Sequence, residues 1–116
     1  MPRPGRATAR SLGLDRSAPV FAALGDETRL RLVSRLCEDG PSSITHLAAG
    51  STVTRQAITK HLHVMKEAGL VRASWHGRES IWELESERLE VARRSLDAIS
   101  KHWDAALDRL KKLVEG

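Results

Sequence analysis

At 116 residues the chain is long enough for one small domain and too short for a second core. Hydrophobic residues make up 41% of it, enough for folding, and the formal net charge of +4 suits a polyanionic partner. No apolar run is long enough for a signal peptide or a membrane span, so we expect a cytoplasmic protein with no membrane partner. The single cysteine, Cys37, excludes an intrachain disulfide.

The first 17 residues predict a disordered basic arm. They lack apolar periodicity, are rich in Pro, Gly and Ala, and carry four arginines against one acid, namely Arg3, Arg6, Arg10 and Arg16 against Asp15. Such an arm is either a loose tail or a segment that enters a DNA minor groove.

Residues 18–85 predict a DNA-binding domain that begins with two packed helices. The first starts at Pro19–Leu24 and the second covers Asp26–Glu38, ended by the Gly-Pro pair that follows Asp39. The apolar stripe of the second helix is Leu30, Val33, Leu36 and Cys37, with Leu32 at its flank. Cys37 is expected to fill core space, and a redox-sensing thiol is the alternative.

A helix-turn-helix follows. Ser42–Ala49 reads as a short capped helix, residues 50–53 form a turn, and the stretch from Thr54 to Gly69 reads as the second helix. Ala57, Ile58, Leu62 and Met65 make its core stripe. The other face offers hydrogen-bond donors suited to phosphates and base edges: Arg55, Gln56, Thr59, Lys60 and His63, preceded by Thr54. An ordinary amphipathic surface helix is the alternative.

Two short strands come next, Leu70–Trp75 and Ser80–Leu84, joined by a turn at residues 76–79. A hairpin directly after a recognition-type helix is a wing, and its basic side chains are Arg72, His76 and Arg78. Residues 51–82 carry five bases against two acids, so positive charge gathers on the helix and wing. The predicted fold is mainly α with a small β-hairpin (α+β), a winged helix-turn-helix of order α-α-α-α-β-β-α.

Residues 86–116 predict a long C-terminal dimerisation helix. Apolar residues alternate three- and four-residue steps without a break, a heptad pattern that needs a partner surface. Part of this stripe should pack on the domain and the rest on a second copy, through an interface of Leu89, Leu96, Ile99, Trp103, Leu110 and Leu113. A purely intramolecular helix is the alternative.

The chain resembles the ArsR/SmtB-type winged-helix transcriptional repressors. The matching pieces are Ala23–Val33, Thr59–Leu62, Glu67–Val71 and the wing Gly77–Glu79. The resemblance implies a homodimer that binds double-stranded DNA at a palindromic operator and represses its own operon. Many relatives release DNA when a metal or another signal arrives.

The metal-sensing pattern of that family is broken in this chain. Where such relatives carry Cys pairs, in the first helix of the helix-turn-helix, residues 43–47 offer only His46. The C-terminal helix offers only His102 with Asp97, Asp104 and Asp108 nearby, too few good ligands for a tetrahedral zinc site. We therefore expect no metal site and no cofactor, and the inducing signal is left open. A metal site across the dimer, using His102 and an acid, is the alternative.

An enzyme is the least expected class, since the chain has no Gly-rich phosphate loop and no nucleophile with a supporting base. The competing class is a winged helix that serves as a protein-interaction module. Such modules lose the basic face of the recognition helix, which this chain retains in Arg55 and Lys60.

Overall fold

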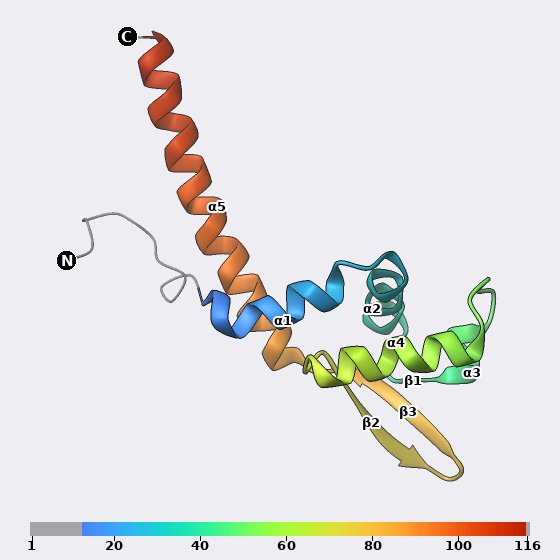
Figure 1. The fold of residues 1–116 in the computed structure, drawn as a ribbon. Helices are drawn as coiled ribbons and strands as arrows, with labels where there is room; N and C mark the ends of the chain where they lie inside the picture. The colour runs from blue at the N-terminus through green and yellow to red at the C-terminus, as the bar shows by residue number, and fades with distance from the viewer. Residues whose placement is uncertain (1–12, 116) are drawn as a thin grey trace.

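The computed structural model describes residues 13–115 and confirms the winged helix-turn-helix fold (Figure 1). Two helices and a helix-turn-helix unit precede a β-hairpin, and one long helix ends the described residues. The elements in order are α1 (Leu14–Leu24), α2 (Glu27–Asp39), β1 (Ser42–Ser43), α3 (Ile44–Ala48), α4 (Arg55–Glu67), β2 (Val71–His76), β3 (Glu79–Leu84) and α5 (Ser86–Glu115). No described helix is both long and apolar enough to cross a membrane.

The first helix begins earlier than the sequence indicated, at Leu14 instead of Pro19, with Pro19 inside it. The Ser17 hydroxyl donates a hydrogen bond to the Gly13 carbonyl at 2.9 Å, and Ser17 is fully buried. The prediction of disorder through residue 17 is therefore wrong for residues 14–17, because small side chains let α1 pack closely on α5. The arginines at positions 3, 6 and 10 lie outside the described residues.

The buried stripe of α2 is also shifted from the predicted one. Leu32 and Leu36 are buried in the core, whereas Leu30 is 51% exposed and Cys37 is exposed. The sequence of α2 allows two helical stripes, one through positions 30, 33 and 37 and one through positions 32 and 36. Which stripe is buried depends on how α1, α4 and β3 are placed around α2. Cys37 is therefore a surface thiol and does not fill core space.

The sheet has three antiparallel strands in the order β1-β3-β2. The two-residue strand β1 was expected to be the start of a helix, because two residues are too short to show a strand period. In the register, Trp82 of β3 lies between Ser42 of β1 and Ala73 of β2, and it is buried. One face of the hairpin therefore closes the core beneath α3 and α4. The other core members are mostly aliphatic and come from every helix and from the start of the hairpin: Val20, Ala23, Leu32, Leu36, Leu47, Ile58, Leu62, Met65, Leu70, Val71 and Ala92.

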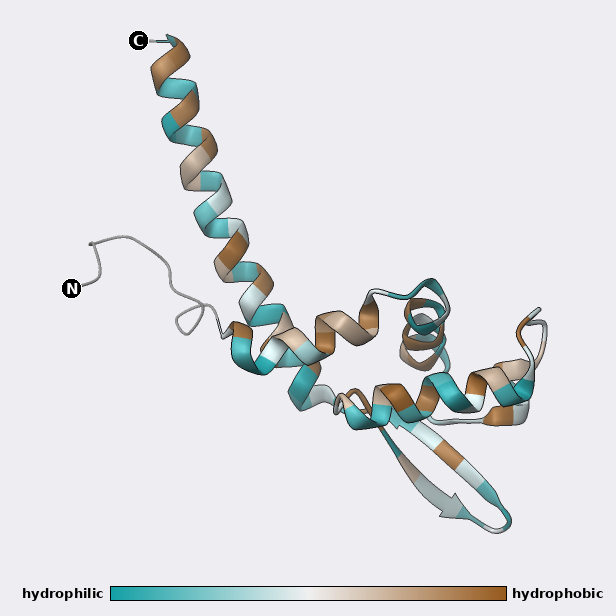
Figure 2. Cartoon of the chain, in the orientation of Figure 1, coloured by the Kyte–Doolittle hydropathy of each residue, from teal (hydrophilic) through white to brown (hydrophobic). Residues whose placement is uncertain are grey.

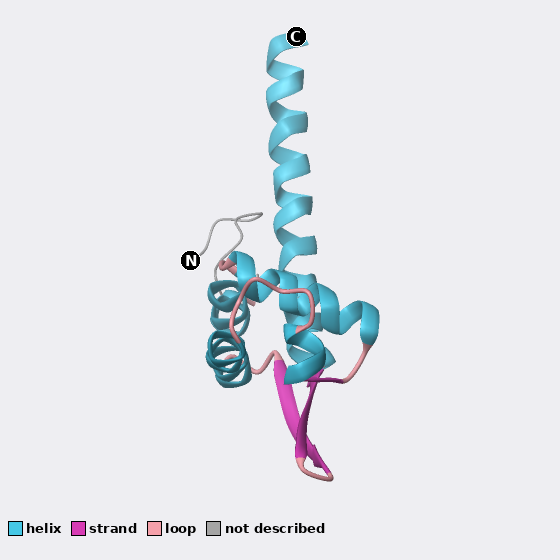
Figure 3. Cartoon of the chain, turned by 90° about the vertical axis from the view of Figure 1, so that its right-hand side faces the viewer, coloured by secondary structure: helices cyan, strands magenta, loops and turns pink. Residues whose placement is uncertain are grey.

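The long helix α5 has two distinct parts. Near its start, Ala92 and Ser95 are buried against α1, and a Cβ on Gly13 would lie only 3.2 Å from the Ser95 hydroxyl. The rest of α5 projects away from the body and makes the molecule 64 Å long (Figure 1). Figure 2 shows apolar bands along this projecting part. The wing lies at the opposite end of the molecule, as the rotated view shows (Figure 3).

Candidate nucleic-acid interface

The recognition helix α4 is anchored by its apolar side and leaves its donors free. The hydroxyl of Thr54 accepts a hydrogen bond from the backbone N–H of Ala57 at 3.1 Å and so caps the helix. Ile58, Leu62 and Met65 are buried in the core. The opposite side is therefore turned to solvent, and the predicted contact residues on it are exposed: Gln56, Lys60 and His63.

Arg55 and Thr59 lie on a flank of α4, where part of their donor capacity is used. An Nη1–H of Arg55 donates to the Thr45 hydroxyl of α3 at 3.0 Å. The Thr59 hydroxyl donates to the Arg55 carbonyl of its own helix at 2.9 Å. Arg55 is thus held toward α3 with further N–H groups left for a ligand, while Thr59 offers DNA mainly its methyl group and an acceptor.

The turn before α2 contacts α4 and helps to hold it in position. Asp26 accepts a hydrogen bond from the backbone N–H of Arg29 at 3.0 Å, and this bond lowers the pKa of the Asp26 carboxyl, helped by the nearby Arg29 charge. The Arg29 guanidinium donates to the Ala23 carbonyl and lies 3.3 Å from Nδ1 of His61 on α4. The Asp-Arg pair near the start of the chain therefore holds the recognition helix in place through His61.

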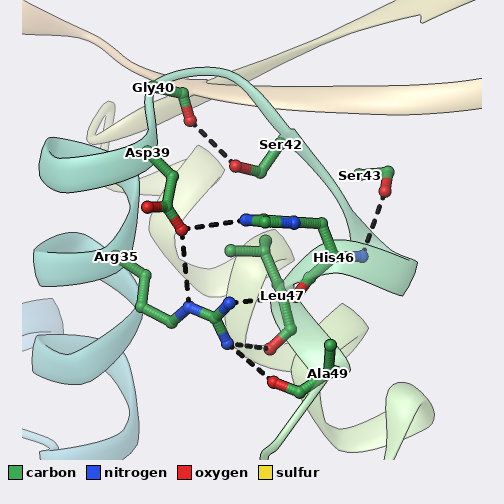
Figure 4. Close-up of polar contacts among 8 residues, drawn as sticks. All are labelled: Arg35, Asp39, Gly40, Ser42, Ser43, His46, Leu47 and Ala49. Carbon is green, nitrogen blue, oxygen red and sulfur yellow. Dashed lines mark hydrogen bonds and ion pairs between the residues drawn. The ribbon is translucent and has the colours of Figure 1, made fainter.

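A second brace fixes α3, the first helix of the helix-turn-helix (Figure 4). The Arg35 guanidinium donates to the carbonyls of His46, Leu47 and Ala49 at 3.0–3.2 Å. These carbonyls lie at the end of a helix, where intrahelical donors run out, and of the three the His46 carbonyl also accepts from the backbone N–H of Ala49 at 3.2 Å. Asp39 joins the cluster, 2.8 Å from Nε2 of His46 and 3.8 Å from Nε of Arg35. His46 is therefore engaged in fixing α3 to α2.

His63 also contributes to the position of α4 on the sheet. Its ring meets the buried Trp82 ring edge to face, with centroids 5.6 Å apart. The residue remains exposed, so one side of the imidazole supports the helix and the other faces solvent.

The three basic residues predicted on the wing do not all lie on the same side of it. The register pairs Arg72 with Glu83 and His76 with Glu79, which places both on the outer face of the hairpin, away from α4. The positive charge of Arg72 is also paired with a carboxylate, since its Nε lies 2.6 Å from Glu83. The hydrogen bond to Glu83 raises the pKa of Arg72. The structure therefore does not bring Arg72 and His76 to the donor face of α4. Successive side chains of a strand point to opposite faces, so residues grouped by their charge alone, as these were in the sequence, need not share a face.

Arg78 and Trp75 lie on the side of the wing that faces the helices. The two-residue loop Gly77-Arg78 closes the hairpin, with Gly77 at a φ of 65°, where glycine is favoured. Trp75 shares the inner face with Ala73 and is 75% exposed. Trp75 was not among the site residues predicted from the sequence. The alternation from Val71 through Ala73 was the signal that could have placed it beside the recognition helix.

Among residues 13–115, no cluster of three or more His, Cys, Asp or Glu side chains is arranged to hold a metal ion. His102 and its acidic neighbours lie on the exposed part of α5.

Comparisons with known proteins agree with this architecture. Residues 24–73 match a family model described as a helix-turn-helix domain. The chain is 34% identical over 95 residues to the HTH-type transcriptional regulator Rv2034 of Mycobacterium tuberculosis, covering 82% of this chain and 85% of that protein.

Solved structures show the same fold. An ArsR-like transcriptional regulator from Rhodococcus sp. RHA1 superposes with a TM-score of 0.70 at 36% identity, over 86% of this chain and 93% of that one. A domain of Mb0332 from Mycobacterium bovis, described as a homodimeric winged helix-turn-helix DNA-binding domain, gives a TM-score of 0.61 at 24% identity, over 85% of this chain and 90% of that one. The chain belongs to the ArsR family of winged helix-turn-helix, DNA-binding transcriptional regulators, which are not enzymes.

Proposed function

We propose that the protein is a homodimeric, sequence-specific regulator of the cytoplasm that binds a palindromic operator and represses its own operon. The observation that carries this proposal is the arrangement of two surfaces on one chain. A donor-rich recognition helix lies in the body, and an apolar helix face projects from the far side of it (Figures 1 and 2).

The projecting face supports the dimer. We call it the exposed seam, and it consists of six large apolar side chains on α5 that are 39–79% exposed, Leu96, Ile99, Trp103, Leu107, Leu110 and Leu113. A continuous apolar stripe of this kind is expected to be covered in solution. A second copy of α5 fits it, because its heptad spacing is that of helices packed on each other. Leu89, expected in the interface, packs instead on the core of its own chain, so the seam begins at Leu96.

A symmetric dimer supports the palindromic operator. Two recognition helices related by a two-fold axis read two half-sites about 34 Å apart, one turn of B-DNA. Within each half-site we assign base reading to Gln56 and Arg55 and phosphate contact to Lys60. Glutamine and arginine match base edges with two hydrogen bonds, whereas lysine acts as a point charge.

The test is binding to the DNA upstream of the protein's own gene over a range of salt. Lys60→Ala should weaken binding on all sequences and lower the slope of log K against log salt by about one. Gln56→Ala should instead reduce discrimination at one base pair, by about 1–3 kcal/mol. Lys111→Ala, which removes the same charge from the exposed end of α5, is the matched control and should leave the slope unchanged.

A wild-type protein without salt-dependent affinity for this DNA would contradict the proposed function and favour a protein-interaction module. Equal loss in Lys60→Ala and Lys111→Ala would show that the charge acts only through the overall field of the protein.

We further propose that regulation does not use the family's usual metal sites. His46, the one candidate ligand in α3, is hydrogen-bonded to Asp39. DNA release by a metal requires different metal affinities in two states, typically by 1–3 kcal/mol. The protein should therefore hold its operator equally with zinc, with a chelator and after Cys37→Ser. Release by low micromolar zinc would contradict this and direct attention to His102 with Asp104 or Asp108 across the dimer.

A further inference from the structure

Trp75 is a large apolar side chain on the wing with no role in the core. It is 75% exposed, whereas Trp82 on the neighbouring strand is buried at 3%. Tryptophan is highly buried on average in folded proteins, and its flat ring carries a large contact area. An indole in this position is available to a ligand and contributes little to folding.

The surroundings of Trp75 identify the kind of ligand. The indole lines a groove of about 170 Å³ between the wing and the helix-turn-helix. Arg55 comes from the first turn of α4 and Arg78 from the wing tip, so two residues with guanidinium groups line the same groove as the indole. The remaining lining is largely small and polar, from Ser43, Ile44, Thr45, Glu79 and Ser80.

Alternating charge and apolar surface is the chemistry of a sugar–phosphate backbone. Arginine binds phosphate through two parallel hydrogen bonds. The C–H groups of a deoxyribose offer an indole ring an apolar surface for van der Waals contact. Arg55 belongs to the recognition helix, so a strand in this groove would run alongside the helix that reads the bases. An apolar protein segment would match the ring equally well, but it would supply no counter-charge to Arg55 and Arg78.

We propose that Trp75 packs on a deoxyribose of one DNA strand in this wing groove, with Arg78 on a neighbouring phosphate and the base-reading Arg55 beside it. The proposal rests on the DNA binding of the protein and adds a contact that depends on the indole. Glu79, also in the lining, opposes the phosphates, so Glu79→Gln should strengthen binding.

The experiment compares Trp75→Ala, Trp75→Phe and wild type on the DNA upstream of the gene over a range of salt. Trp75→Ala should lose about tenfold in affinity with an unchanged salt slope, because an apolar contact releases no counterions. Trp75→Phe should recover most of the loss. Arg78→Ala should lower the slope by about one. Thermal unfolding of Trp75→Ala should match wild type, because the indole is exposed.

His76→Ala is the matched control, since it removes the neighbouring ring from the outer face of the same strand. Wild-type affinity in Trp75→Ala, or equal losses in Trp75→Ala and His76→Ala, would overturn the wing-groove proposal. A wild-type protein that fails to bind DNA at all would instead contradict the proposed function.

Discussion

The two parts of α5 use one helical repeat for opposite purposes. In the first part, the two side chains that are buried where α1 crosses are small, Ala92 and Ser95, and Leu89 is partly buried on the core. In the second part, the same spacing carries large residues such as Trp103 and Leu110, which are 62% and 57% exposed. Small residues let two helices of one chain approach closely, and large ones provide the area that an association between chains needs. Residue size along one stripe thus separates folding from assembly.

The largest effect should come from the exposed seam. Trp103→Ala should weaken the dimer by about 3–5 kcal/mol if the ring is buried between two copies of α5. Sedimentation over a dilution series measures this loss. Trp75→Ala removes a similarly exposed indole from the wing and is the control. Equal association of both variants would show that Trp103 is not at the contact.

A core substitution should act within one chain. Leu62 is fully buried, and Leu62→Ala should lower the free energy of unfolding by about 2–5 kcal/mol. Denaturant unfolding at two protein concentrations separates the two regions. The loss for Leu62→Ala should be the same at both, whereas the loss for Trp103→Ala should depend on concentration. If the loss of unfolding free energy in Leu62→Ala depended on protein concentration, folding of the core and association of the chains would not be separate processes.

The brace at α3 should have a smaller effect on the body. Arg35→Ala removes the guanidinium from three carbonyls at the end of α3, of which the His46 carbonyl keeps the Ala49 N–H, and should cost about 1–3 kcal/mol of unfolding free energy. Arg31→Ala, on the same helix, removes only an exposed pair with Glu27 and should cost about 0.5 kcal/mol or less. Both are measured by denaturant unfolding. Similar losses in the two variants would argue against the brace.

The smallest effect concerns pH and the cap of α2. The pKa of Asp26 is lowered in the folded protein, so the carboxylate stabilises the fold above its unfolded pKa of about 3.9, and this contribution is lost as the pH falls through the lowered value. Asp26→Ala should therefore be less stable than wild type at pH 6. The gap should shrink toward pH 3, as followed by thermal unfolding. A gap independent of pH would assign the loss to packing.

Strongly periodic segments were predictable from the sequence, and relations between segments were less so. The cap at Thr54 and the buried face of Ile58, Leu62 and Met65 follow from local rules, and the structure has both. The sides of α2 and of the wing depend on which elements lie against them. Leu30 was therefore placed in the core, and Arg72 was grouped with the recognition helix although it pairs with Glu83 on the outer face.

Hydrogen bonds across the chain were outside the reach of local patterns. The contacts of Arg35 with the end of α3 and of Arg29 with His61 join residues 11–32 positions apart. The first helix was shortened in prediction because Pro19 was taken as a start, whereas Gly13 and Ser17 allow it to begin at Leu14 against α5. The long-range hydrogen bonds and the early start of α1 both depend on how helices pack against each other, and the spacing of residues within one helix does not determine this.

The central claim is that the exposed seam of α5 is covered by a second copy of the chain. Sedimentation of the wild-type protein at micromolar concentration tests it most directly. The account predicts a single species of twice the 12.8 kDa chain mass, persisting on dilution through the range in which Trp103→Ala dissociates. A species of 12.8 kDa at every concentration would contradict the dimer and, with it, the reading of a palindrome by two paired recognition helices.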